Sequence, residues 1–217
     1  MRKIITKENL LCKFKSQSTI MIGGFLGVGT PDMLIDSLLE SKTDDLTLIC
    51  NDTGFETKGV GKLVVNKRLS KAIVSHIGTN RETGRQMNSG QLAIELVPQG
   101  TLAERIRAGG AGLGGILTPI GIGTLVENGK KKIQVNNKEY LLETPLCADI
   151  ALIKAYKADE AGNLVLRCTA RNFNQVMAIA ADYVIAEVEE IVPVGEIKPD
   201  DVTIPGIFVD AIIKGCE

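Results

Sequence analysis

A short apolar strand, a loop with four glycines and a helix follow one another within residues 18–40. The β-branched and apolar run at residues 19–22 is typical of a buried strand. A helix is then expected to begin with Thr30 as its N-cap and Pro31 at its first position. A strand that leads through a glycine loop into a helix is typical of α/β proteins, so this segment restricts the fold class more than any other.

The same alternation of strands and helices continues along the chain. Apolar runs predict further strands at residues 46–50, 72–75, 94–97, 150–153 and 183–186. Helices are expected at residues 174–181 and at residues 101–108, where Thr101 and Glu104 match a capping box. This order predicts a mostly parallel, doubly wound sheet, and no internal repeat is evident.

Ligands of such sheets bind at the carboxyl ends of the strands. Four segments that follow predicted strands are therefore the candidate site: residues 23–29, 51–54, 75–78 and 98–100. Residues 109–145 differ in character, because they are rich in glycine and then alternate between polar and apolar residues. A β-hairpin is predicted there, with residues 132–135 and 139–142 as its strands. We expect one domain over residues 1–217 with a small inserted β subdomain at about 109–145.

Charge and composition exclude several classes of function. The 217 residues include 25 Lys and Arg and 26 Asp and Glu, and this balance does not suit binding to nucleic acid. Residues 1–15 are too charged for a signal peptide, and no apolar run is long enough for a membrane helix, so we expect a cytoplasmic protein without membrane attachment. With one histidine and no CxxC, we expect no metal site or disulfide framework, and the five cysteines are expected to be buried reduced thiols: Cys12, Cys50, Cys147, Cys168 and Cys216.

The glycines of residues 23–29 indicate a site for an anion or a developing oxyanion, built from backbone N–H groups before a helix. A tight turn is the alternative, although a turn alone needs only one or two glycines. A nicotinamide site is not indicated. Asp32 stands where a GxGxxG motif beginning at Gly27 needs its third glycine, and the literal match at residues 110–115 follows a predicted helix.

No convincing nucleophile accompanies this loop. The sequence has no GxSxG elbow, and any Ser–His or Cys–His pair depends on His76 alone. Glu127 and Glu160 both lie in predicted turns. The chain therefore offers an anion-binding loop without a catalytic group.

Three segments resemble the alpha subunits of family I CoA-transferases. They are IMIGGFLGVGTP at residues 20–31, PQGTLAERIRAGGAG at residues 98–112 and ARNFN at residues 170–174. The resemblance covers almost the whole chain and is strongest to bacterial transferases that act on acetate, butyrate and acetoacetate. One departure is Ser16-Gln17, where the family has an Asp-Gly or Asn-Gly pair before the first strand.

The resemblance implies a three-layer α/β/α fold that is shared with ribose-5-phosphate isomerase. It implies an enzyme that moves CoA from an acyl-CoA to a carboxylate by ping-pong kinetics, through a glutamyl-CoA thioester. The nucleophilic glutamate is expected on a separate beta subunit, in an α2β2 assembly. CoA is then a substrate, and no permanently bound cofactor is expected.

The resemblance also assigns residues to the site. CoA would lie against Gly23, Gly24, Phe25, Leu26, Gly27, Val28 and Gly29. Asn51 and Gln99 would support catalysis by donating amide N–H groups, whereas Arg171 and Asn172 would fix a loop near the interface. Two alternatives remain open at this point: a sugar-phosphate isomerase, which would need a carboxylate base beside a lysine, and a metabolite-binding regulatory subunit.

Overall fold

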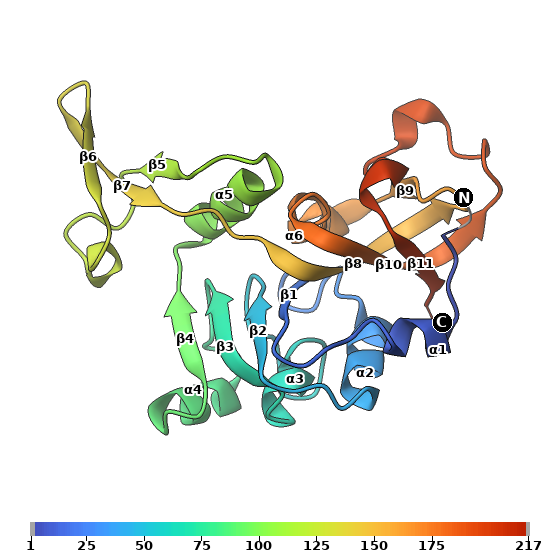
Figure 1. The fold of residues 1–217 in the computed structure, drawn as a ribbon, viewed down its shortest axis with the longest axis horizontal. Coiled ribbons are helices and arrows are strands. Elements are labelled where there is room, and N and C mark those ends of the chain that lie inside the picture. Colours follow the sequence, from blue (N-terminus) through green and yellow to red (C-terminus); the bar gives the residue numbers. More distant parts are fainter. Residues whose placement is uncertain (1–2, 216–217) are drawn as a thin grey trace.

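The computed structural model describes residues 3–215, and its main element is a mostly parallel sheet (Figure 1). The strands of this sheet are β1 (Thr19–Ile22), β2 (Leu46–Ile49), β3 (Leu69–Val74), β4 (Ala93–Leu96), β8 (Ala148–Asp159), β9 (Leu164–Val165), β10 (Ala181–Val192) and β11 (Ala211–Lys214). Seven of them pair in parallel in the order β11-β10-β8-β1-β2-β3-β4, and β9 pairs antiparallel with β8. The predicted parallel sheet is therefore confirmed, although β8 and β10 are much longer than the apolar runs suggested.

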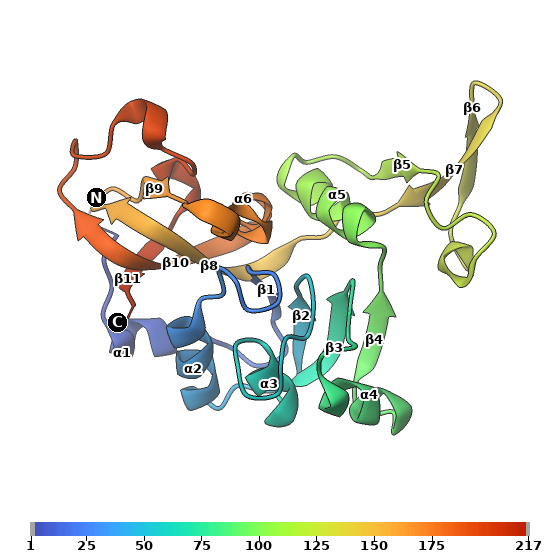
Figure 2. The same ribbon diagram turned by 180° about the vertical axis from the view of Figure 1, so that it is seen from behind.

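Helices cover both faces of the sheet. They are α1 (Lys7–Leu11), α2 (Asp32–Glu40), α3 (Gly61–Val65), α4 (Arg81–Asn88), α5 (Gln99–Gly110) and α6 (Phe173–Met177). One core contains Leu10 of α1, Leu34 of α2 and Leu63 of α3, and a separate core contains Leu102 of α5 and Met177 of α6. Figures 1 and 2 accordingly show α5 and α6 on the opposite side of the sheet from α1 to α4. The result is the three-layer α/β/α fold.

A small antiparallel sheet, which we call the β arm, lies within residues 109–145. It consists of β5 (Ile116–Thr118), β6 (Lys132–Val135) and β7 (Lys138–Glu143) in the order β5-β7-β6. Asn136 and Asn137 both have positive φ, 49° and 60°, so they form a two-residue hairpin turn, and Lys138 already belongs to β7. The arm projects from the molecule at the end far from β11 (Figures 1 and 2).

Charged groups connect the β arm to the main sheet. Arg105 of α5 is buried, and its Nε donates to the Thr144 carbonyl at 2.8 Å while its Nη1 pairs with Glu95 of β4 at 2.7 Å. Burial alone would raise the pKa of Glu95, but the hydrogen bonds and charges of Arg105 and Lys71 lower it overall. Because Arg105 bonds to both β4 and the arm, it fixes α5 and therefore the position of its first residue, Gln99.

The expected N-cap of α2 is wrong for a physical reason. The helix begins at Asp32 after Pro31, and the Thr30 side chain makes no capping hydrogen bond. The buried Glu187 of β10 takes that place, because its Oε2 accepts from the backbone N–H groups of Met33 (2.9 Å) and Leu34 (3.1 Å). Burial raises the pKa of Glu187, although Lys154 opposes this shift. The N-terminus of α2 was expected to bind a ligand anion, but the carboxyl group of Glu187 already occupies this position.

The capping box at Thr101 and Glu104 is also wrong. The helix α5 begins two residues earlier, at Gln99, with Pro98 as its N-cap. Thr101 therefore lies in the first turn, where its hydroxyl group is buried without a hydrogen-bond partner among the described residues. Gln99 thus belongs to a helix rather than to a loop.

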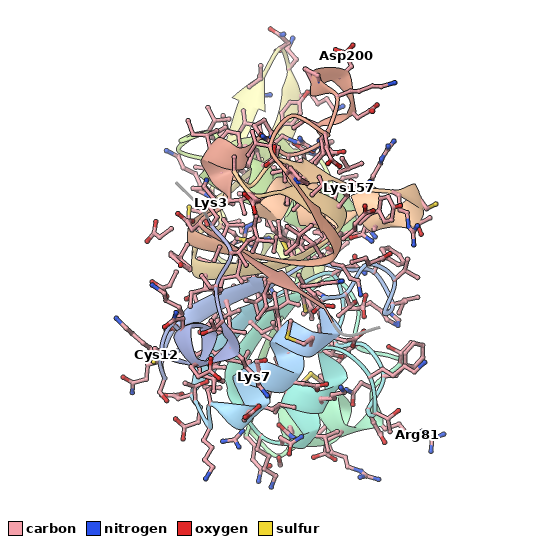
Figure 3. All side chains as sticks on the ribbon, turned by 90° about the vertical axis from the view of Figure 1, so that its right-hand side faces the viewer. Lys3, Lys7, Cys12, Arg81, Lys157 and Asp200 are labelled. Atoms are coloured by element: carbon pink, nitrogen blue, oxygen red, sulfur yellow. The ribbon has the colours of Figure 1, made fainter. Side chains whose placement is uncertain are left out.

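The cysteines are free thiols in the described part of the chain, but most of them are not buried. Only Cys50 is buried, whereas Cys12 lies at the edge of the molecule (Figure 3) and Cys147 and Cys168 are exposed. Burial raises the pKa of the Cys50 thiol well above its ordinary value, and the charge of Asp52 adds to this effect. Cys216 lies outside the described residues.

The departure at Ser16-Gln17 has a clear structural meaning. These residues form a turn before β1, and Gln17 has a φ of 65°, a conformation that glycine adopts without strain.

Within residues 3–215, no helix is long and apolar enough to cross a membrane. In the same residues, no three His, Cys, Asp or Glu side chains lie together as potential metal ligands.

Candidate functional site

The two amide side chains expected to support catalysis lie together at the carboxyl ends of the strands. Asn51 is the second residue after β2, and Gln99 is the first residue of α5, shortly after β4. Gln99 Nε2 donates to Asn51 Oδ1 at 3.1 Å. The hydroxyl group of Ser75, which follows β3, donates to the Asn51 backbone carbonyl at 2.7 Å and also lies 3.2 Å from Asn51 Oδ1. The ends of three neighbouring strands thus meet at one amide group, as parallel pairing requires.

Asp52 connects these amides to the glycine loop, and the sequence analysis assigned it no role. Asp52 is buried, with 5% of the residue exposed. Oδ2 accepts from Asn51 Nδ2 at 2.6 Å and from the Leu26 N–H at 2.9 Å, and Oδ1 accepts from the Gly54 N–H at 2.8 Å. An aspartate two residues before a glycine is the signal that could have revealed this turn.

The Asp52 carboxylate fixes which way the Asn51 amide faces. A carboxylate only accepts hydrogen bonds, so Asn51 must turn its NH2 group toward Asp52 and its oxygen toward Gln99. Gln99 is therefore the donor in its bond with Asn51, and its second N–H has no partner among the described residues. Asn51 is 2% exposed, whereas Gln99 is exposed. Of the two amides, Gln99 is the one that can reach a ligand.

The glycine loop, residues 23–29, closes on itself by two backbone hydrogen bonds. The Phe25 N–H donates to the Val28 carbonyl at 3.0 Å, and the Val28 N–H donates back to the Phe25 carbonyl at 2.9 Å. The loop after β2 has the same form, because Phe55 and Lys58 pair in the same way and glycines again precede and follow the pair. The two loops share the pattern Gly-Phe-x-x-x-Gly, at residues 24–29 and 54–59, so the same kind of turn follows β1 and β2.

Packing within the chain explains three of the four glycines in the glycine loop. A Cβ at Gly23 would lie 1.9 Å from Asn174 Oδ1, one at Gly24 2.3 Å from Thr30 Oγ1, and one at Gly29 2.9 Å from the Ala170 Cα. Gly27 differs, because a Cβ there would meet no atom within 4 Å. The number of glycines is thus a weaker sign of ligand binding than the sequence suggested, and Gly27 is the position that is open to a ligand.

A cleft of about 600 Å³ lies beside Gln99. Its walls combine apolar side chains with two arginines, namely Phe25, Ala103, Val176, Ile179, Ile204, Phe208, Arg107 and Arg171. The described residues that line it include no carboxylate. Arg171 Nε donates to the Leu166 carbonyl at 3.2 Å, which agrees with its expected role in fixing a loop.

Two carboxylates of this chain, Glu127 and Asp52, are engaged in contacts within the chain. Glu127 accepts from the Gly123 N–H at 2.7 Å and pairs with Lys132 at 3.0 Å, and these contacts lower its pKa, with the Gly123 hydrogen bond as the larger cause. It lies in a short helix of the β arm (Leu125–Glu127). Asp52 is buried and accepts three hydrogen bonds, so it is not free to attack a substrate. His76 carries an exposed side chain and accepts from the Thr53 N–H through its carbonyl oxygen.

Relatives of known name extend over the whole chain. It is 53% identical over 215 residues to the acetate CoA-transferase subunit alpha of Escherichia coli strain K12, with 99% of this chain and 98% of that protein covered. It is 51% identical over 212 residues to the alpha subunit of the acetoacetyl-CoA:acetate/butyrate CoA transferase of Clostridium acetobutylicum, with coverage of 98% and 97%.

Solved structures show the same fold at low sequence identity. An acyl-CoA transferase from E. coli O157:H7, solved as a thioester complex with CoA, matches with a TM-score of 0.88 and 22% identity. The match covers 99% of this chain but 47% of that one, so this chain spans about half the length of that transferase. Glutaconate CoA-transferase from Acidaminococcus fermentans matches with a TM-score of 0.86 and 21% identity, over 98% of this chain and 75% of the other. The family model described as coenzyme A transferase matches residues 6–215, and the chain therefore belongs to this family.

Proposed function

We propose that this chain is the alpha subunit of a short-chain acyl-CoA transferase whose nucleophilic glutamate lies on a separate beta subunit. The observation that carries the proposal is the cleft beside Gln99, which offers an oriented amide donor and two arginines but no carboxylate in its described lining. Two relatives are named as alpha subunits of transferases for acetate and for acetoacetyl-CoA with acetate or butyrate. Their names support both the partner and the substrate class.

In the proposed reaction, a carboxylate oxygen of the partner's glutamate attacks the thioester carbon of the acyl-CoA. The C–S bond breaks, an acyl-glutamyl anhydride forms, and the CoA thiolate leaves. The thiolate then attacks the glutamyl carbon, which releases the first carboxylate and leaves a glutamyl-CoA thioester. A second carboxylate reverses these steps. CoA is a substrate in this scheme, and no permanently bound cofactor takes part.

Gln99 is the residue of this chain that we place at the reacting carbonyl group. Negative charge develops on the carbonyl oxygen during each attack, and a fixed N–H donor lowers the energy of that state. The free N–H of Gln99 can donate to this oxygen, because the bond to Asn51 already holds the amide in one orientation. Asn51 then acts by orienting Gln99, and Asp52 by orienting Asn51.

The tip of the glycine loop is proposed to contact CoA. Glu187 already caps α2, the Leu26 N–H bonds to Asp52, and both backbone groups of Val28 bond within the chain. Gly27, with open space beside it, therefore remains as the ligand-facing residue of the loop. Phe25 and Val28 are 39% and 48% exposed, which suits a surface that the beta subunit or CoA covers. An α2β2 assembly in the cytoplasm is the form that we propose, in keeping with free exposed thiols.

We expect Gly27→Ala to raise the KM for acyl-CoA about tenfold, because the new methyl group projects from the loop tip into the space that a ligand would fill. Gly27 has a φ of 85°, so alanine also adds backbone strain. Gly90→Ala is a matched control, since it has a φ of 73° and open space but follows α4, away from the site. Steady-state kinetics of both variants test this expectation, and an unchanged KM for Gly27→Ala would remove the loop tip from the CoA site.

The function itself is tested by a CoA-transfer assay with acetyl-CoA as donor and acetoacetate as acceptor. The purified chain alone is expected to show no transfer, and mixing it with its beta subunit is expected to produce activity and an α2β2 mass. Turnover of a sugar phosphate by the chain alone would instead support the isomerase. Binding of acyl-CoA without transfer by the mixture would support a regulatory subunit.

A further inference from the structure

We propose that Asn172 and Asn174 form a clamp that positions the glycine loop for its ligand. Both side chains come from the segment between β9 and α6 and its first turn, and they hold two successive carbonyl groups of the loop, those of Val28 and Gly29. The functional part of this inference rests on the proposed role of the loop in binding acyl-CoA. The two residues are called the asparagine clamp below.

Asn174 is the buried half of the asparagine clamp. It is 0% exposed, and its Nδ2 donates to the Gly29 carbonyl at 2.9 Å and to the Ala170 carbonyl at 3.0 Å. Its Oδ1 accepts from the Lys154 backbone N–H on β8 at 2.9 Å. The same oxygen occupies the space beside Gly23, at the other end of the loop. One fully bonded amide therefore joins both ends of the loop to the central sheet.

Asn172 is the outer half of the clamp. Its Nδ2 donates to the Val28 carbonyl at 3.0 Å and to the Thr169 carbonyl at 2.8 Å. Its Oδ1 is buried without a partner among the described residues, so the two carbonyls alone set the orientation of this amide. The Val28 carbonyl also closes the turn with Phe25, and Asn172 therefore supports the turn from outside.

Hydrogen bonds hold the tip of the glycine loop from two sides. Asp52 holds the Leu26 N–H on one side, and the asparagine clamp holds the Val28 and Gly29 carbonyls on the other. The tip between them is exposed and apolar, with Leu26 at 38% and Val28 at 48%, so its own packing contributes little to its order. A loop that is already ordered loses less conformational entropy when it binds a ligand. Asn174 is fully buried and acts only through the loop, whereas Asn172 also lines the cleft beside Gln99. The clamp favours binding by ordering the loop, as a positioning element does.

The first test measures the loop directly, by hydrogen exchange of the full-length chain. Asn172→Ala is expected to raise the exchange rates of the Phe25 and Val28 amides about tenfold, because one hydrogen bond to the turn is lost. Asn174→Asp keeps the acceptor for Lys154 but loses both donors, and a similar or larger increase is expected. Asn66→Ala is the matched control, since Asn66 Nδ2 also donates to a backbone carbonyl, that of Lys62 at 2.8 Å, but at the end of α3. Unchanged exchange of the loop in Asn172→Ala would overturn the clamp, even if Asn174→Asp fails to fold.

The second test separates positioning from general support of the fold. In the complex with the beta subunit, Asn172→Ala is expected to raise the KM for acyl-CoA about tenfold and to change the KM for the carboxylate acceptor by about threefold or less. Faster loop exchange with an unchanged KM for acyl-CoA would contradict the positioning role. An equal rise in the KM for acyl-CoA in the Asn66→Ala control would show that the effect is one of general stability and would contradict the positioning role. If the unsubstituted complex transfers no CoA, the proposed function fails, whereas the exchange experiment still decides whether the clamp exists.

Discussion

Replacement of Gln99 by alanine is expected to lower the kcat of the complex about a hundredfold, which is the usual cost of losing one donor to a developing oxyanion. The KM for acyl-CoA is expected to change by about threefold or less, because the donor acts mainly in the transition state. Steady-state kinetics with acyl-CoA as the varied substrate measure both constants. An effect confined to KM would show that Gln99 binds the ground state and would contradict the role proposed for it.

Two further variants make the Gln99 experiment specific. Gln99→Glu has nearly the same shape but no N–H donor, so it is expected to lose as much activity as Gln99→Ala. Gln91→Ala is the matched control, because Gln91 is also an exposed glutamine but lies beyond α4.

Asp52→Asn tests the orientation of the Asn51 amide. It replaces one acceptor oxygen by a donor, so Asn51 can turn over, and a smaller loss of kcat is expected than for Gln99→Ala.

The sequence predicted β1 and β2 well because both are short apolar runs that are largely buried. Ile20 and Leu48 are each 1% exposed, and their neighbours in the sheet are apolar as well. The sequence did not predict β9 and β11, and it underestimated the length of β8 and β10. Sequence patterns were less informative at the ends of helices, where distant residues decide. Thr30 is a favourable N-cap by local rules, but the chain brings Glu187 of β10 to that helix, and no local pattern contains this information.

In the candidate site, too, local sequence patterns were informative, whereas contacts between distant residues were not predicted. The segments that contain Asn51 and Gln99 could be placed together because both follow strands whose ends converge, and the family resemblance implied that these two amides support catalysis. Asp52 and Asn174 were overlooked because their importance comes from contacts with the glycine loop rather than from their own position. The glycines show the reverse error. Four in one loop suggested a ligand site, yet Gly23, Gly24 and Gly29 are explained by the side chains packed against them, and only the structure distinguishes them from Gly27.

The largest expected effect concerns which chain carries the covalent intermediate. Borohydride added to the complex after acyl-CoA is expected to reduce the glutamyl thioester to an alcohol and to abolish transfer activity. Borohydride without acyl-CoA is the control and is expected to leave activity intact, because no thioester is then present. Peptide mapping by mass spectrometry is expected to place the modified glutamate on the beta subunit.

The structure explains why this chain should remain unlabelled. The described residues that line the cleft beside Gln99 include no carboxylate, and the buried carboxylate nearest in the hydrogen-bond network, Asp52, accepts three hydrogen bonds. Attack on a thioester needs a carboxylate oxygen that can reach the acyl carbon, and Asp52 would have to break its bonds to Asn51 and Leu26 to provide one. Modification of Asp52, Glu127 or Glu160 would overturn the assignment of the nucleophile to the partner, and modification of Asp52 would also overturn its orienting role. If the modified glutamate is found on the beta subunit alone, the proposed role of this chain remains to bind CoA and to stabilise the charge that develops during transfer.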